Sequence, residues 1–416
     1  MAAFELTEET KQQVERIGSA DVVVGIAGPV SPEQLRARAE QTLQQLGTAT
    51  SALRFVFAWP KAASNSNGGS AFENSPLTVL PFAPPAQGGA EFWAGVSANQ
   101  RAVLSLAASM NARACIVLGP DLAALNAHCI QLFTYAVLDR QCGLAMPVYP
   151  AAKYDGLINT GMLSPLCRAL YGKRVRYPVT FDFVAAGPLC GSLSHTGPTA
   201  AASGDALLWP VTIAATQHPQ LPVGQVEIDV HHKVATDGLD LSVVLGQLLG
   251  SLFQEMDQCA SHWQRIRGSQ PIPVWGGTAE DPSDVQPVDP QPMIDSFLLG
   301  SRNLDEVWRL ILPPNSLLEL RRLTRLNPEQ FRMPDDLWAS IVYDFALAWR
   351  LRTISRVHLL GALTPLYLGW VASWVREVSG LNHGAAEQRF EQLARAWEEK
   401  KPYLLSRWRW PDRFNP

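Results

Sequence analysis

The segment between residues 21 and 59 constrains the fold most strongly. Residues 21–28 read D-V-V-V-G-I-A-G, an apolar run without alternation, which predicts a strand of a sheet covered on both faces. Ser31, Pro32 and Gln34 then have the pattern of a helix start, with a capping serine, a proline at the first position and a capping box. Residues 53–59 predict a second buried strand. A strand–helix–strand start implies a right-handed crossover, so we predict an open α/β sheet.

The next hundred residues extend this pattern. Residues 60–89 are rich in Ser, Asn, Gly, Pro and Ala, which predicts a long loop with one short strand at 77–80. A helix is expected over 97–111, followed by a buried strand at 114–118 that ends in G-P-D. Ligands of open α/β sheets bind beyond the carboxyl ends of the strands. We therefore expect residues 25–30, 58–62 and 119–121 to face one crevice.

The second half of the chain is helical. An apolar helix is expected over 240–262, and residues 268–292 contain many prolines and acidic residues, which is the composition of a linker. Short loops then separate expected helices at 293–312, 315–326, 334–351, 355–378 and 384–400. We predict a domain at 1–267, a Pro-rich linker at 268–292 and an all-α C-terminal domain at 293–416.

Composition excludes several classes of function. The net charge is -4 with both signs interspersed, so nothing favours nucleic acid as a partner. The six cysteines form no C-x-x-C pair and are typical of reduced thiols in a cytosolic protein. No apolar run reaches the length of a membrane span, and the first residues lack a signal-peptide pattern. We expect a cytoplasmic protein without a membrane span.

Residues 145–183 carry the most unusual motif. A helix-like segment over 159–171 ends at Gly172, and three cations follow it: Lys173, Arg174 and Arg176. The spacing suits either of two structures, a site for an anion such as a diphosphate or a solvated helix end, where Lys and Arg are common.

This segment also resembles a known family. The runs K-Y-D-G-x-I-N-T and P-L-x-R-A-L-Y-G-K-R-V-R-x-P, followed by Asp182-Phe183, are similar to the glucosylglycerate and mannosylglycerate synthase-like glycosyltransferases, which use nucleotide sugars. The likeness continues in the runs L-W-A-S-I-V-Y-D-F-A-L-A, L-T-P-L-Y-L-G and K-P-Y-L-L-S-R-W. It implies a GT-A fold: an open mixed sheet with helices on both faces, plus a helical C-terminal domain.

The resemblance implies a metal site that is incomplete in this sequence. The family ends a strand with an Asp-x-Asp motif that holds Mg²⁺ or Mn²⁺ on the donor diphosphate, because a hard cation neutralises the departing phosphates. Here Gly119 takes the place of the first Asp and only Asp121 remains. The family's histidine aligns with His231 or His232, and His232 fits without a gap. The implied ligands are therefore Asp121 and His232, in a site weakened by Gly119.

Other polar positions of the family differ as well. The place of its nucleobase-binding Asp reads Ala58-Trp59-Pro60, and a turn that carries a lysine in the family ends here in Val96-Ser97. A Gly-x-Asp-x-Trp segment has leucine at the Asp position, with Asp205 two residues away. The polar residues retained imply roles in catalysis for Asp155 and Asp182 and in donor or cofactor binding for the remaining four, which are Ser97, Lys153, Lys173 and Arg176.

Two functions follow from these observations, and the sequence leaves both open. The first is hexosyl transfer from a nucleoside diphosphate sugar to a small hydroxylated acceptor such as a glycerate-like acid. The second is a catalytically inactive, glycosyltransferase-like binding or partner subunit, because four polar positions are lost while the helical frame persists. A metal-free transferase that uses the cations of 173–176 is a weaker third reading. Broad apolar helices lead us to expect a homodimer or association with a related subunit.

Overall fold

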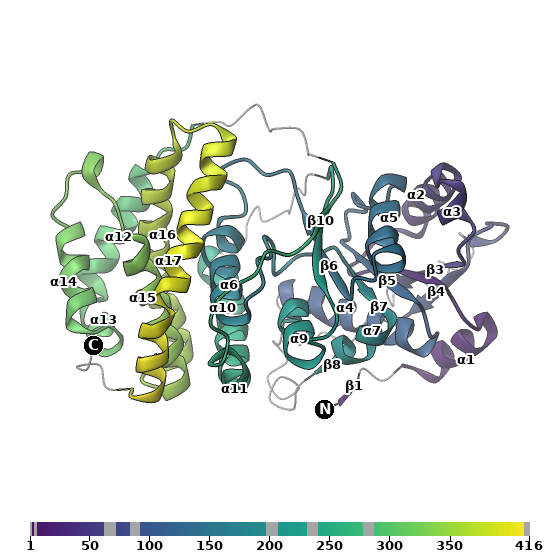
Figure 1. The fold of residues 1–416 in the computed structure, drawn as a ribbon, viewed down its shortest axis with the longest axis horizontal. Coiled ribbons are helices and arrows are strands. Elements are labelled where there is room, and N and C mark those ends of the chain that lie inside the picture. Colours follow the sequence, from purple (N-terminus) through teal and green to yellow (C-terminus); the bar gives the residue numbers. More distant parts are fainter. Residues whose placement is uncertain are drawn as a thin grey trace. The chain divides into compact units, whose positions relative to one another are not determined.

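The computed structural model describes residues 2–3, 6–61, 72–83, 92–196, 207–230, 240–277 and 287–411. Contacts within the chain divide it into two compact units (Figure 1). The first, here called the sheet unit, comprises 1–150, 175–234 and 271–280. The second, the helical unit, comprises 151–174, 235–270 and 281–416.

The sheet unit contains one eight-stranded mixed sheet. Its strand order is β10-β9-β6-β7-β5-β2-β3-β4, and only β7 runs antiparallel to its two neighbours. A separate two-residue pair joins β1 and β8. The strands are β1 (Ala2–Ala3), β2 (Val22–Ile26), β3 (Phe55–Pro60), β4 (Val79–Phe82), β5 (Ala114–Leu118), β6 (Leu144–Val148), β7 (Phe183–Ala186), β8 (His195–Thr196), β9 (Val223–Glu227) and β10 (Val274–Trp275).

Helices cover both faces of this sheet. Every residue of the central strands β2 and β5 is buried, as the unbroken apolar runs predict. One face packs on α2 (Pro32–Gln45) and α5 (Ala127–Thr134), and the other packs on α4 (Phe92–Ser109) and α7 (Gly187–Ser194). The remaining helices of the unit are α1 (Glu8–Ile17), α3 (Thr48–Ser51), the π-helix η2 (Tyr135–Asp139) and α9 (Pro210–Gln217).

Gly25 shows how closely α4 approaches the sheet. A Cβ atom added at Gly25 would lie 2.0 Å from Cγ1 of Val103 on α4, so only glycine fits at this point of β2. The predicted fold class is confirmed: an open mixed sheet with helices on both faces, and a helical C-terminal region.

The helical unit is built around four fully buried tryptophans. Trp338, Trp370, Trp374 and Trp397 form a chain of ring contacts across three long helices. The elements are the π-helix η3 (Asn159–Leu163), α6 (Ser164–Tyr171), α10 (Leu241–Gln258), α11 (Ala260–Trp263), α12 (Gln291–Asn303), α13 (Asp305–Ile311), α14 (Pro314–Leu323), η4 (Pro328–Gln330), α15 (Asp335–Leu351), α16 (Arg356–Val378) and α17 (His383–Arg409).

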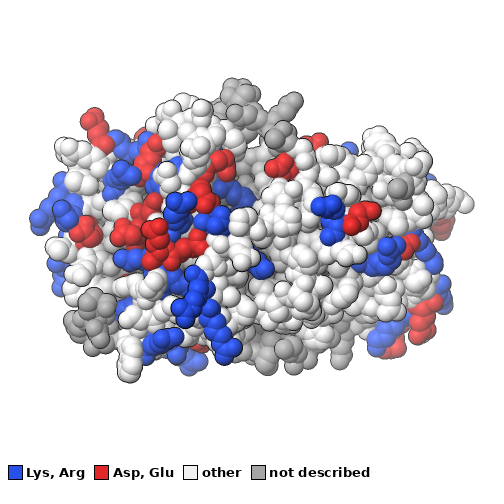
Figure 2. Space-filling view, in the orientation of Figure 1, with Lys and Arg blue, Asp and Glu red and all other residues white. Residues whose placement is uncertain are grey.

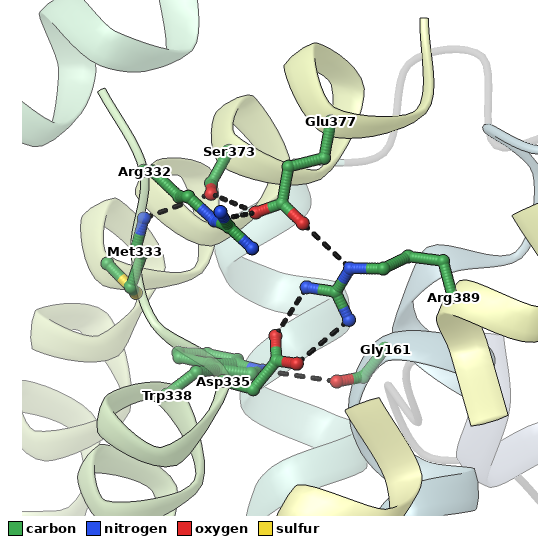
Figure 3. A network of polar contacts seen from close by, with 8 residues as sticks. All are labelled: Gly161, Arg332, Met333, Asp335, Trp338, Ser373, Glu377 and Arg389. Carbon is green, nitrogen blue, oxygen red and sulfur yellow. Dashed lines mark hydrogen bonds and ion pairs between the residues drawn. The ribbon is translucent and has the colours of Figure 1, made fainter. Parts of the chain in front are cut away.

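A charged network ties α15, α16 and α17 together (Figure 3). The guanidinium of Arg389 donates two parallel hydrogen bonds to Asp335, at 2.7 and 2.8 Å, and a third of 2.7 Å to Glu377. Arg332 and Ser373 donate to the other oxygen of Glu377 at 3.1 and 3.2 Å. The side chains of Arg389, Asp335 and Glu377 are at most 18% exposed, so this network is screened little by solvent.

Each predicted helix has a counterpart, whereas α5, α7 and α9 were not predicted. Helix α4 begins at Phe92 and not at residue 97, and three further differences concern the helical unit. The segment expected as one helix over 293–312 is broken at Leu304 into α12 and α13, and the long helix expected over 240–262 is interrupted at Cys259. The last helix continues to Arg409, past an internal Pro402. Within the described residues, no helix is long and apolar enough to cross a membrane.

The domain boundaries predicted along the sequence stay a prediction. The two compact units are interleaved in sequence, because 151–174 and 235–270 pack with the C-terminal helices. Within the segment expected as a linker, β10 adds a parallel strand beside β9. The chain therefore passes between the units several times.

Candidate functional site

The carboxyl ends of β2, β3 and β5 lie at one edge of the sheet. The strand order reverses direction between β2 and β5, which is the point where open α/β sheets bind ligands. The loops that follow these two strands touch: a Cβ atom at Gly28 would lie 2.8 Å from Cβ of Pro120. The indole of Trp59 donates to the carbonyl of Val30 at 3.1 Å. The three predicted loop segments therefore meet at this edge, as far as they are described.

Asp121 projects from this edge at the end of β5. Its side chain is exposed, and Oδ1 accepts a hydrogen bond of 3.0 Å from the backbone N–H of Ala123. The next residue, Leu122, has φ +56°, an uncommon backbone conformation for a leucine. A strained, tight turn thus holds one carboxylate at the sheet edge where a ligand is expected.

Gly119 lies where the resemblance leads us to expect the first Asp, and the side chains nearest to it are those of Phe181 and Asp121. A Cβ atom at Gly119 would lie 3.0 Å from Cβ of Phe181. The ring of Phe181 is stacked on Trp93 of α4, with centroids 4.8 Å apart. An aspartate at this position would press against this aromatic pair.

Asp182 lies at the centre of a buried polar network. It has no exposed surface, and its Oδ1 accepts a 2.8 Å hydrogen bond from the backbone N–H of Gly119. Oδ2 accepts a 2.8 Å hydrogen bond from the hydroxyl of Tyr149, which also pairs with Thr180. Burial raises the pKa of Tyr149, and the negative charge of Asp182 raises it further. This arrangement keeps Tyr149 protonated as a donor and braces the loop that carries Asp121.

Ser97, expected to contact the donor, lies on α4 and is buried. Its hydroxyl accepts a 3.1 Å hydrogen bond from the backbone N–H of Leu208. On the same helix, Gln100 donates to the carbonyls of Thr180 and Phe181, at 3.1 and 3.3 Å. Ser97 thus positions the segment at Leu208 against α4, and Gln100 positions the segment at Thr180 and Phe181.

Trp59 lies at the position where the resemblance leads us to expect a nucleobase-binding Asp. Only 1% of its surface is exposed, and it belongs to the core cluster formed by β2, β3, β5, α2 and α5. Its ring contacts Phe72 with centroids 5.8 Å apart. The position is thus part of the apolar core.

Lys153 and Asp155 lie in the helical unit. The ammonium of Lys153 donates to the carbonyls of Ser379 and Leu381, at 2.8 and 3.0 Å, just beyond the last turn of α16. Asp155 is exposed and accepts a 2.9 Å hydrogen bond from the backbone N–H of Ala152. Lys153 therefore caps a helix end, where a cation is favoured by the helix dipole.

The segment around Gly161 explains why the motif runs of 153–174 and the C-terminal helices occur together. A Cβ atom at Gly161 would lie 1.8 Å from Trp370, and the carbonyl of Gly161 accepts from the indole of Trp338 at 3.1 Å (Figure 3). The indole of Trp374 donates to the carbonyl of Lys153 at 2.9 Å. These motif residues pack directly on α15 and α16.

The predicted cations after Gly172 have separate surroundings. Gly172 ends α6 with φ +69°, as expected for a helix C-terminus. Lys173 is half-buried in the helical unit and pairs with Gln270 through a β-bridge. Arg174 donates to Ser269 at 3.0 Å. Arg176 belongs to the sheet unit, where its backbone N–H donates to Gln225 at 2.6 Å.

The described residues provide too few ligands for a divalent metal ion. Nowhere in the described ranges do three His, Cys, Asp or Glu side chains gather in a possible metal site. Gly119 supplies no ligand, and both oxygens of Asp182 are taken by Gly119 and Tyr149. His232 and Asp205 lie outside the described residues. Of the two ligands expected from the sequence, the structure describes only Asp121, and one carboxylate alone gives too few oxygen ligands for a divalent ion.

Sequence reasoning missed several residues of this site. Tyr149, Thr180 and Gln100 complete the network around Asp182, but no motif or spacing singled them out. The only signal was position, because Tyr149 follows the strand β6 directly.

The chain is similar to solved structures of glycosyltransferases at low sequence identity. No protein-family model and no curated protein matches the chain. One similar solved structure is glucosyl-3-phosphoglycerate synthase from Mycobacterium tuberculosis with Mn²⁺, UDP and glucosyl-3-phosphoglycerate. Its sequence is 13% identical, the match covers 62% of this chain and 86% of the synthase chain, and the TM-score is 0.38. Another is a mannosyltransferase from Pyrobaculum calidifontis with GDP-Man and Mn²⁺. Its sequence is 12% identical, the match covers 97% of this chain and 93% of the mannosyltransferase chain, and the TM-score is 0.35.

Proposed function

We propose that this chain transfers a hexosyl group from a nucleoside diphosphate sugar to a small hydroxylated acceptor, such as a glycerate-like acid. The observation that carries the proposal is the position of Asp121. Its exposed carboxylate lies at the carboxyl end of β5, beside the point where the strand order reverses. The motif resemblance of 153–183 supports the same class of reaction.

In this proposal Asp121 accepts hydrogen bonds from hydroxyl groups of the donor or acceptor. Asp182 and Tyr149 hold the loop from behind, through the N–H of Gly119, so that Asp121 keeps one orientation. A carboxylate held in place in this way orients its partner at little further entropic cost. Roles for Asp155, Lys173 and Arg176 in holding acceptor or phosphate remain part of the proposal.

A second candidate is a non-catalytic binding or partner subunit with the same fold. Two observations favour it. A Cβ atom added at Gly119 would lie only 3.0 Å from Cβ of Phe181, and a core tryptophan, Trp59, lies at the expected nucleobase position. Both features replace polar contacts to a donor by apolar packing.

One experiment separates the two candidates. The purified chain is titrated calorimetrically with UDP-glucose and GDP-mannose, with and without Mn²⁺, and release of UDP or GDP is followed with glycerate or phosphoglycerate present. The first candidate predicts binding and acceptor-dependent release, and Asp121→Asn lowers turnover by about 100-fold, in the range for a positioned polar group. The matched control is Asp139→Asn, an exposed aspartate of the same unit.

Three outcomes are informative. Binding with turnover that needs Asp121 supports transfer. Binding of a donor without turnover supports the partner subunit. A chain that binds neither donor, or equal effects of Asp121→Asn and Asp139→Asn, contradicts the proposed role of Asp121.

A further inference from the structure

Three helix ends meet at one end of the helical unit: the end of α15, the start of α16 and the end of α17 (Figure 1). The guanidinium of Arg350 lies 4.6 Å from the ring of Trp408 and donates to the carbonyl of Trp408 at 2.8 Å. Arg356 similarly lies 4.2 Å from the ring of Trp349. These stacked pairs hold the three helix ends in contact.

Large apolar side chains project from this end into solvent. Val357 on the first turn of α16 is 81% exposed, and Trp410 after α17 is 71% exposed. Leu351 is 45% exposed. Val357 and Trp410 are the most exposed of the large hydrophobic residues that the structure describes. A cluster of this kind marks an interaction surface far more often than single scattered residues do.

Arginine is the most frequent charged residue around these side chains, beside the exposed carboxylate of Asp257. Arg352, Arg356 and Arg409 are exposed, and none of them has a carboxylate within ion-pair distance among the described residues. Arg350 pairs with Asp257 at 3.4 Å. The sequence has no Asp or Glu over 345–376 or over 400–411, and Asp412 follows directly. In Figure 2, several Lys and Arg side chains lie over the lower part of the helical unit, and most of its visible acidic side chains lie farther up.

We propose that this surface binds the anionic phospholipid headgroups of a membrane. We call it the arginine–tryptophan face and define it by its six residues, Leu351, Arg352, Arg356, Val357, Arg409 and Trp410. Guanidinium groups bind phosphate bidentately, and juxtaposed cations are attracted to the negative surface of an anionic bilayer.

The apolar members decide between a membrane and other anionic partners. Tryptophan is enriched at the membrane–water interface, and short apolar side chains flanked by arginines enter the headgroup region to a depth of about 5–10 Å. Nucleic acid offers phosphates but no apolar layer for Val357 and Leu351. The attachment is peripheral, and it holds whether or not the chain transfers sugar.

The test measures vesicle binding by the full-length chain. Vesicles of pure phosphatidylcholine are compared with vesicles containing 30% phosphatidylserine, about the fraction that gives a strongly negative surface, in a co-sedimentation assay at 0.1 M salt. We expect binding to the anionic vesicles only. Each arginine near the surface contributes about a fivefold factor in partitioning, so the triple variant Arg352→Gln/Arg356→Gln/Arg409→Gln should bind about 100-fold more weakly.

Two further variants make the result specific. Val357→Ser/Trp410→Ser removes the apolar side chains and should weaken binding even at low salt. The triple variant Arg321→Gln/Arg322→Gln/Arg325→Gln removes three exposed arginines elsewhere on the same unit and should bind as the wild type. All these positions are exposed, and a melting curve confirms that each variant folds.

Several outcomes overturn the proposal. These are no preference for anionic vesicles, an equal loss in the two arginine triple variants, or unchanged binding after Val357→Ser/Trp410→Ser. Tighter binding to RNA than to vesicles, lost in the same face variants, would assign the face to nucleic acid instead.

Discussion

The backbone N–H of Gly119 donates a 2.8 Å hydrogen bond to Oδ1 of Asp182, a carboxylate with no exposed surface. The loop bearing Asp121 is consequently anchored from within the sheet.

We predict that Asp182 contributes mainly to stability. Asp182→Ala leaves the N–H of Gly119 and the hydroxyl of Tyr149 without an acceptor in a buried site, so the free energy of unfolding should fall by about 3 kcal/mol. Tyr149→Phe removes one partner and should cost about 1 kcal/mol. Chemical denaturation measures both. Because the two residues touch, the double variant should lose less than the sum of the single losses.

The sequence also makes Asp182 a candidate catalytic residue. A catalytic role and a role in stability can be separated by experiment. If Asp182→Ala unfolds at the wild-type denaturant midpoint but loses turnover, the stability role is wrong. The exposed Asp139→Ala is the control, with an expected effect within about 0.5 kcal/mol.

Gly119 should not tolerate a side chain. Gly119→Ala brings a Cβ atom to 3.0 Å from Phe181, and we expect a loss of about 1 kcal/mol from overpacking. Gly246→Ala in α10 is the matched control, because nothing lies within 4 Å of its added Cβ. This control should gain about 0.5–1 kcal/mol from helix propensity. Equal shifts in melting temperature for the two variants would contradict the packing argument.

Arg389 is predicted to be a strong determinant of the helical unit. Arg389→Ala leaves the carboxylates of Asp335 and Glu377 largely buried beside each other, so the unfolding free energy should fall by about 3 kcal/mol. Arg322→Ala breaks the exposed pair with Glu319 and should cost at most about 0.5 kcal/mol. Denaturant melts of both variants, at low and high salt, decide the point. If Arg389→Ala lost no more unfolding free energy than the control, and the loss became smaller at high salt, the network would behave as an exposed ion pair.

Asp344 should make stability depend on pH. Burial raises the pKa of Asp344 to about 7, although Arg407 and the hydroxyl of Tyr403 act in the opposite direction. The unfolded value is about 3.9. Between about pH 4 and pH 7 the folded protein therefore holds a proton that the unfolded chain has released. Stability from this group is fully present below pH 4 and is lost as pH rises through 7.

The measurement compares wild type with Asp344→Asn. The unfolding free energy of the wild type, minus that of the variant, should fall by up to about 4 kcal/mol between pH 4 and pH 8. The exposed Asp336→Asn, on the same helix, is the control for the substitution itself. A difference that rises with pH would mean that Arg407 dominates and that the carboxylate is charged in the folded state.

The sequence determined the local structure and the class of fold. Unbroken apolar runs predicted β2 and β5 because both faces of a central strand are covered, and the capping pattern at Ser31 placed the start of α2 at the residue observed. Such features depend only on neighbours along the chain. The same is true of Gly172, whose positive φ ends α6 as predicted.

Only the tertiary structure decided what the polar residues do. Asp182, Ser97 and Lys153 were expected at a ligand, and each is bonded to backbone groups far away in sequence: Gly119, Leu208 and the pair Ser379 and Leu381. A motif names the residue type but cannot show which groups desolvate it. Burial and hydrogen-bond partners come from contacts between distant segments, and these contacts exist only once the chain has folded.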